Sequence, residues 1–140
     1  MYRKILVAYD GSEGAKRALR AGIDIAKRYG AELHSIAVVE KLPHFAATVG
    51  EVKEALRELT TRYEWISQDA ARVAKDQGID LHAKVQPGHE VEAVVTYAKE
   101  GKFDLLVIGF SGHSHAFGRV MGGTAQNLAR LSPCTVMIAK

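Results

Sequence analysis

The residue types best suited to chemistry in this chain are the glycines of one loop. Gly109 and Gly112 follow a short apolar run, and Gly122-Gly123-Thr124 opens a segment with apolar residues at helical spacing. Glycines let a backbone approach a ligand closely, and the free N–H groups and dipole at a helix start favour an anion. The pattern predicts a loop that binds the phosphates of a nucleotide.

Asp10 is a second candidate, because its carboxylate comes directly after another apolar run and before Gly11-Ser12. Such a side chain can hold Mg²⁺ beside a phosphate, or it can cap the following turn. Arg119, inside the glycine loop, could equally well contact the phosphates or face solvent. His113 and His115 are too few for a closed metal site.

The sequence predicts no complete catalytic set. Hydrolysis of ATP needs a positioned water or base, and no second acid accompanies Asp10. The single cysteine, Cys134, lies in an apolar run and is interpreted as a small buried side chain. Tyr63 and Trp65 are interpreted as packing residues rather than as a stacking platform. Because no second acid accompanies Asp10, we expect at most slow hydrolysis of ATP.

The elements that must position these residues alternate between strand and helix. Apolar runs predict strands over 4–9, 33–39, 103–108 and 134–139, and an alternating pattern predicts one over 81–85, near a sheet edge. Helical spacing predicts helices between Ser12 and Gly30, over about 52–74, over 90–100, and from Gly122 to Pro133. This order favours an α/β fold, a doubly wound parallel sheet of five strands with helices on both faces.

If the strand order is 3-2-1-4-5, the order reverses between the first and fourth strands. Ligands of doubly wound sheets bind beyond the carboxyl ends of the strands at such a reversal. The loops at that point are 10–12 and 109–122, which hold the candidate residues found above. Two independent patterns thus indicate the same site.

Composition sets the class of protein. The chain has 140 residues, of which 47% are hydrophobic and 25% charged, with a formal net charge of +3. These values predict one domain over residues 1–140 and a globular protein. The sequence shows no basic stripe interleaved with aromatic residues, so nucleic-acid binding is not predicted. It also shows no apolar span long enough to predict a membrane segment. We expect a cytoplasmic protein.

Several motifs together resemble those of a known family. They are Ala8-Tyr9-Asp10-Gly11-Ser12, the spacing Gly109-x-x-Gly112-(nine residues)-Gly122, and Ser132-Pro133-Cys134. On these motifs and the order of elements, the whole chain resembles the universal stress protein family and its adenine nucleotide alpha hydrolase-like fold. The glycine spacing is similar to that of the branch that binds ATP.

The resemblance implies a role for each matching residue. Asp10 would contact the ribose or a Mg²⁺ ion bound to the phosphates, and Val38 would hydrogen-bond adenine through its backbone. The resemblance also implies ATP, AMP or cyclic AMP as ligand. The implied nucleotide-binding residues are Ala8, Tyr9, Asp10, Val38, Gly109, Gly112, Gly122, Gly123, Thr124 and Ala125.

The chain departs from the family's motif at two positions. Gly123 stands where the motif has Ser or Thr, and Ala125 stands where many members have another hydroxyl, so that only Thr124 offers one nearby. A neutral hydrogen bond contributes about 0.5–1.5 kcal/mol, and losing one or two weakens binding about tenfold. The backbone donors are unaffected.

The final strand is apolar and is predicted to lie at a sheet edge, which invites pairing with another chain. The resemblance implies a two-fold homodimer through Thr135, Val136, Met137, Ile138 and Ala139. Three functions remain open: a nucleotide-binding regulatory dimer, a weak ATPase or phosphotransferase, and an interaction module that has lost the ligand.

Overall fold

Five parallel strands form one sheet in the order β3-β2-β1-β4-β5, so the predicted order is confirmed. The computed structural model describes residues 1–40, 48–111 and 120–140. Both strands predicted near an edge, β3 and β5, lie at the two edges of the sheet. The strands are β1 (Lys4–Ala8), β2 (Glu32–Val39), β3 (Leu81–Pro87), β4 (Leu105–Gly109) and β5 (Thr135–Ala139).

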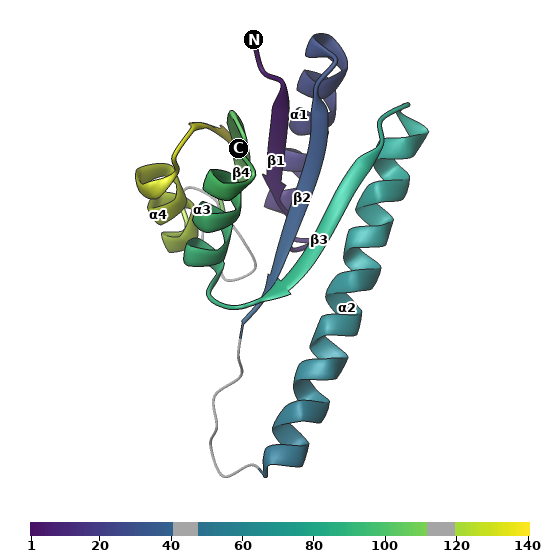
Figure 1. The fold of residues 1–140 in the computed structure, drawn as a ribbon, viewed down its shortest axis with the longest axis vertical. Helices are drawn as coiled ribbons and strands as arrows, with labels where there is room; N and C mark the ends of the chain where they lie inside the picture. The colour runs from purple at the N-terminus through teal and green to yellow at the C-terminus, as the bar shows by residue number, and fades with distance from the viewer. Residues whose placement is uncertain (41–47, 112–119) are drawn as a thin grey trace.

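Helices cover both faces of the sheet, as predicted. α1 (Glu13–Tyr29) and α2 (Val49–Asp76) pack on one face, where Leu19 and Ala70 join a core with Ile5 and Val7. α3 (Glu90–Glu100) and α4 (Gly123–Leu131) pack on the other face (Figure 1). Burying both faces of β1 and β4 explains why these strands are continuously apolar.

Local signals set the ends of α1. The Ser12 hydroxyl accepts a hydrogen bond from the Ala15 N–H at 3.2 Å, and Gly30 adopts the left-handed conformation with φ of 63°. Both features match the sequence prediction, because a short hydroxyl side chain caps a helix start and glycine tolerates a positive φ at a helix end.

Gly101 directly follows α3 but lacks the left-handed conformation that is usual for a glycine at a helix end. Gly101 is the C-cap with φ of −79°, and Lys102 adopts the positive φ of 54°. Glycine is required at 101 for space, since a Cβ there would collide with the Phe103 ring.

α2 begins three residues earlier than the apolar pattern predicts. Thr48 and Glu51 form a capping box, in which each side chain accepts a hydrogen bond from the other residue's backbone N–H. Only the second half of this 28-residue helix contains fully buried residues. Its first half extends past the carboxyl ends of the strands (Figure 1). Among the described residues, no helix is both long and apolar enough to cross a bilayer.

Candidate functional site

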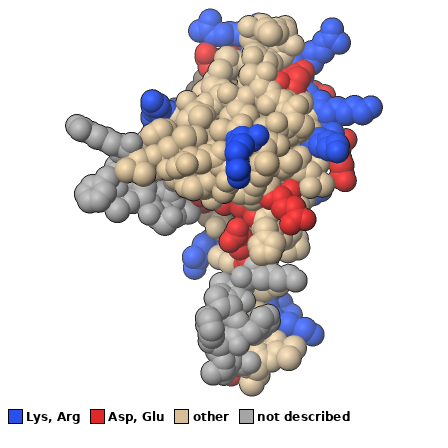
Figure 2. All heavy atoms as spheres, turned by 90° about the vertical axis from the view of Figure 1, so that its left-hand side faces the viewer, with Lys and Arg blue, Asp and Glu red and all other residues tan. Residues whose placement is uncertain are grey.

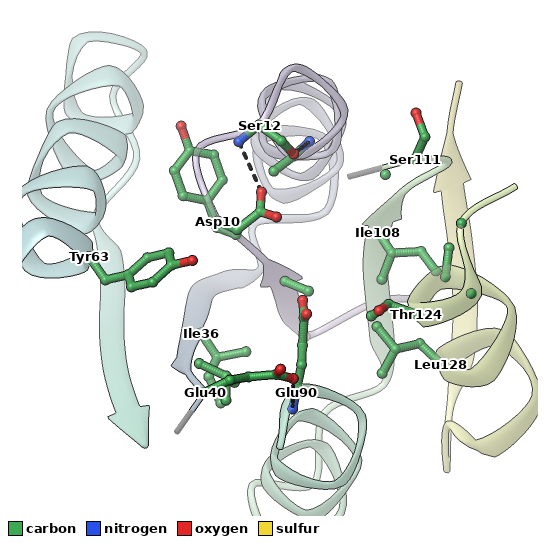
Figure 3. A pocket seen from close by; sticks show the side chains of 18 of the residues that line it. Asp10, Ser12, Ile36, Glu40, Tyr63, Glu90, Ile108, Ser111, Thr124 and Leu128 are labelled. Atoms are coloured by element: carbon green, nitrogen blue, oxygen red, sulfur yellow. Dashed lines mark hydrogen bonds between the residues drawn. The ribbon is translucent and has the colours of Figure 1, made fainter. Parts of the chain in front are cut away.

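A cavity of about 550 Å³ opens at the carboxyl ends of β1 and β4, where the strand order reverses. This volume falls within the roughly 300–1,000 Å³ usual for small-molecule sites. Strand ends, α2 and the start of α4 all contribute side chains (Figure 3). The predicted residues among those that line it are Ala8, Tyr9, Asp10, Val38, Gly109, Gly122, Gly123, Thr124 and Ala125.

Four residues considered from the sequence lie outside the described part of the chain. They are Gly112, which was predicted to contact the nucleotide, and His113, His115 and Arg119. The predictions for these four residues stay predictions.

The first turn of α4 brings main-chain donors to the cavity. Gly122 is the N-cap, and no side chain in the described part of the protein caps this end of the helix. The first turn contains no acidic residue. The first N–H groups of a helix have no partner within the helix, and the dipole adds partial positive charge there. The α4 start is therefore suited to an anion.

The other two helix starts beside this cavity are already capped. Ser12 caps α1 through its hydroxyl, and a Glu40 carboxylate oxygen accepts a hydrogen bond from the Glu90 N–H of α3 at 3.1 Å. A negative charge at the start of α3 satisfies the same donors and dipole that a ligand anion would use. Of the three helix starts beside the cavity, α4 is therefore the one that no described side chain caps.

Asp10 performs the capping role that the sequence left open. One carboxylate oxygen, Oδ1, accepts a hydrogen bond from the Ser12 N–H at 2.9 Å, which fixes the turn between β1 and α1 (Figure 3). The same side chain lines the cavity. Turn formation and ligand contact are therefore compatible in this residue.

Gly109 lines the cavity, but its lack of a side chain has a different cause from the one expected. A Cβ at this position would be 2.6 Å from the Gly14 carbonyl carbon in α1. The glycine therefore permits close contact between strand and helix. Close approach to a ribose is not needed to explain it.

Val38 places main-chain groups at the cavity. The Tyr9 N–H donates to the Ile36 carbonyl at 2.9 Å, immediately beyond the end of β1. Backbone groups alternate between the two sides of a strand, so Val38 directs its N–H and C=O to the same side as Ile36. Because β1 ends at Ala8, it does not pair with the Val38 N–H and C=O, and these groups are directed towards the cavity.

Tyr63 lines the cavity, although the sequence pattern did not indicate it as a site residue. Its ring projects from α2 into the cavity, opposite the side chains of β4 and α4 (Figure 3). Burial raises the pKa of the Tyr63 phenol, and the charges of Asp10, Glu90 and Glu40 raise it further. The phenol is therefore a neutral hydrogen-bond donor. Helical periodicity assigned this residue to the packing face of α2, and the sequence does not show that the face reaches the cavity.

All the charged side chains among the described lining residues are acidic. They include three carboxylates, Asp10, Glu40 and Glu90, and no lysine or arginine. Oxygen ligands of this kind suit Mg²⁺, which commonly uses one or two carboxylates together with phosphate oxygens. At the α4 start, the donors available to a phosphate are main-chain amides and the Thr124 hydroxyl.

A family model described as "Universal stress protein family" matches residues 1–140. A universal stress protein of Thermus aquaticus is 30% identical, over the full length of both chains. Among solved structures, the universal stress protein UspA of Lactobacillus plantarum has a TM-score of 0.89 at 23% identity, covering 99% of this chain and 98% of its own. A universal stress protein crystallised in complex with cAMP has a TM-score of 0.74 at 30% identity, covering 99% of this chain and 97% of its own.

Proposed function

Since the chain belongs to the universal stress protein family, we propose that its cavity binds an adenine nucleotide and that the α4 start binds the phosphate. One observation carries this proposal: the first turn of α4 opens on the cavity without a cap from any described side chain. The cAMP complex of the 30% identical protein supports an adenine ligand of the same kind.

The lining suggests how such a ligand lies. Adenine stacks near Ala8 and Ile36 and exchanges hydrogen bonds with the Val38 main chain, at the β2 end of the cavity. The phosphate lies at the opposite side, against Gly123 and Thr124. The ribose between them is within reach of Asp10, where a hydroxyl donates well to a carboxylate.

The charge of the described lining predicts which nucleotides bind without Mg²⁺. Three carboxylates repel the several negative charges of ATP, whereas AMP and cAMP carry fewer. Mg²⁺ bound by Asp10 and the phosphates would offset this repulsion. We therefore propose that ATP binding requires Mg²⁺ and that binding of cAMP does not.

Calorimetric titration of the purified protein with cAMP, AMP, and ATP with and without Mg²⁺ tests this proposal. Adenosine is the matched control, since it lacks the phosphate that α4 would bind. Expected results are one site per chain, weaker binding of adenosine, and ATP binding that depends on Mg²⁺. If none of these ligands binds, and none is released from the purified protein on denaturation, the chain is an interaction module without nucleotide. Phosphate release from ATP in the same samples would instead indicate an ATPase.

We also propose that the protein acts as a regulatory homodimer, paired through β5 and responsive to the bound nucleotide. β5 is an edge strand, and Val136, Met137, Ile138 and Ala139 are only partly buried within one chain. Figure 2, seen from the side on which α4 lies, shows a broad area with few charged side chains. An apolar, unpaired edge of this kind favours pairing with a second strand.

The register of β5 indicates how to test the dimer. Val136 and Ile138 pack against the core on the α3 side, so lysine at either position would disturb the fold itself. The Ala139 carbonyl accepts from the Phe110 N–H, next to the end of β4, and by alternation Val136 directs its N–H away from β4. Val136→Pro removes that outward donor while leaving the β4 ladder intact. The expected result is a halved mass in solution; a retained dimer would exclude this interface.

A further inference from the structure

A second group of potential ligands lies at the other end of the sheet from the nucleotide cavity. Glu32 and His34 belong to β2, and His82 belongs to the edge strand β3. One ligand atom from each of these three residues lies within 4.8 Å of the other two. The cavity, by contrast, lies beyond Val38 at the far end of β2.

The sheet register brings these three side chains together. His34 and His82 are direct partners in the parallel pairing of β2 with β3. Residues two apart on a strand share a face, so Glu32 lies on the same face as His34. The two imidazole rings have their centroids 4.7 Å apart. Because the backbone of adjacent strands holds both histidines, their separation is largely preset.

One nitrogen of this group makes no hydrogen bond with any described residue. His34 Nε2 is buried and makes none in the described part of the chain. It is 3.8 Å from Glu32 Oε1, beyond hydrogen-bonding distance. A buried polar atom without a partner is uncommon in folded proteins and calls for an explanation. A metal ion bound to this nitrogen would supply one.

Packing against a neighbouring aromatic side chain holds the His34 ring in place. The ring packs edge-on against Phe103, with centroids 4.9 Å apart. Lys4 also lies near this ring. Its ammonium group donates to the Gly101 carbonyl at 2.7 Å and lies over the Phe103 ring, so it interacts with groups outside the three-residue cluster.

We propose that Glu32, His34 and His82 bind a divalent transition-metal ion such as Zn²⁺, with water at the remaining position. Two imidazoles and one carboxylate are a common ligand set for this ion, with metal–ligand distances of about 2.0–2.2 Å. Such distances bring the ligand atoms to within about 3.3 Å of one another in a tetrahedron. Glu32 and His82 are exposed, so their side chains would turn toward the ion, whereas His34 is fixed by packing against Phe103. The bound ion would join β3 to β2 at the open edge of the sheet.

Calorimetric titration of the full-length protein with Zn²⁺ tests the proposal, with His82→Ala as the principal variant. His82 is exposed, so its loss leaves the core intact. His89→Ala is the matched control, because His89 is also exposed but lies beyond the opposite end of β3. Glu32→Gln keeps the shape of the third ligand and removes its charge.

We expect the wild-type chain and His89→Ala to bind one equivalent of Zn²⁺. Glu32→Gln should bind it at least tenfold more weakly, and His82→Ala should not bind it. Zn²⁺ at a hundredfold excess over its Kd should raise the Tm of the wild-type chain by about 5–10 °C, and that of His82→Ala by less. Unchanged stoichiometry in His82→Ala would overturn the proposal. So would the absence of saturable binding to the wild-type chain, in which case the two rings are a packing pair only.

Discussion

Gly109, at the end of β4, lies against Gly14 in the first turn of α1, so closely that a Cβ on Gly109 would be 2.6 Å from the Gly14 carbonyl carbon. A Cβ on Gly14 would in turn collide with the Ser111 carbonyl oxygen. The contact therefore sets the distance between the two loops that frame the cavity. Two residues nearly a hundred positions apart thus need to be glycine for the same reason.

Gly109→Ala should destabilise the protein, because the added methyl group meets backbone rather than a movable side chain. Overpacking of this kind costs about 1–3 kcal/mol, measurable as a lower midpoint of urea unfolding. Gly123→Ala is the control, since a Cβ at Gly123 meets nothing within 4 Å. Equal stability of Gly109→Ala and the wild-type chain would show that the two backbones can separate at no cost.

Gly123→Ser should tighten phosphate binding. The open space at this position accepts a side chain, and a hydroxyl there restores one of the two that the family's motif carries. One added hydrogen bond contributes about 0.5–1.5 kcal/mol, or roughly 2- to 10-fold in Kd. Calorimetry with AMP measures the gain, and adenosine should show none. An equal gain for adenosine would place the new hydroxyl away from the phosphate.

Asp10→Asn and Asp10→Ala should separate the two roles of this residue. Asparagine keeps an acceptor for the Ser12 N–H, so the fold should be nearly as stable as the wild type, whereas alanine should cost about 1 kcal/mol. In both variants Mg²⁺ should raise the affinity for ATP less than it does in the wild-type chain, because neither retains the Asp10 carboxylate. An equal gain from Mg²⁺ in both variants and in the wild-type chain would assign the ion to another ligand.

Tyr63→Ala should weaken nucleotide binding, since the ring forms one wall of the cavity. Trp65→Ala provides the control two residues along the same helix, where the side chain is 69% exposed. We expect a loss of about tenfold in affinity for Tyr63→Ala and none for Trp65→Ala, with calorimetry as the measurement. Equal affinity of the two variants would remove Tyr63 from the site.

The pH dependence of stability should reveal the buried phenol of Tyr9. Burial raises its pKa above the usual value of 10.0, and the charges of Asp69, Asp10 and Glu13 raise it further. The folded state thus holds this proton more tightly than the unfolded chain does. The resulting stability is complete below pH 10 and is lost as the pH rises through the folded-state pKa. Urea unfolding at pH 9 and above 10 should show a smaller decline for Tyr9→Phe than for the wild-type chain.

Most of the fold follows from local patterns in the sequence. Apolar runs such as 4–8 and 105–108 can form only strands covered on both faces, and the helices between them require parallel pairing. Strand ends and helix starts carry their own signals, as the Ser12 cap of α1 shows. Asp10 and Gly122 were identified from local residue patterns, and the reversal of strand order in such a sheet indicates the same place.

The sequence by itself determined the alternation of strands and helices and the main-chain donors at the start of α4, because hydrophobic periodicity and capping act within short stretches of chain. It indicated the location of the candidate site once the strand order 3-2-1-4-5 was assumed. Only the tertiary structure decided which distant residues meet. It placed Tyr63 in the cavity, Gly109 against Gly14, and His34 beside His82. These contacts depend on sheet register and on the path of α2 across the sheet, which arise from packing of the whole chain and leave no signature in residue spacing.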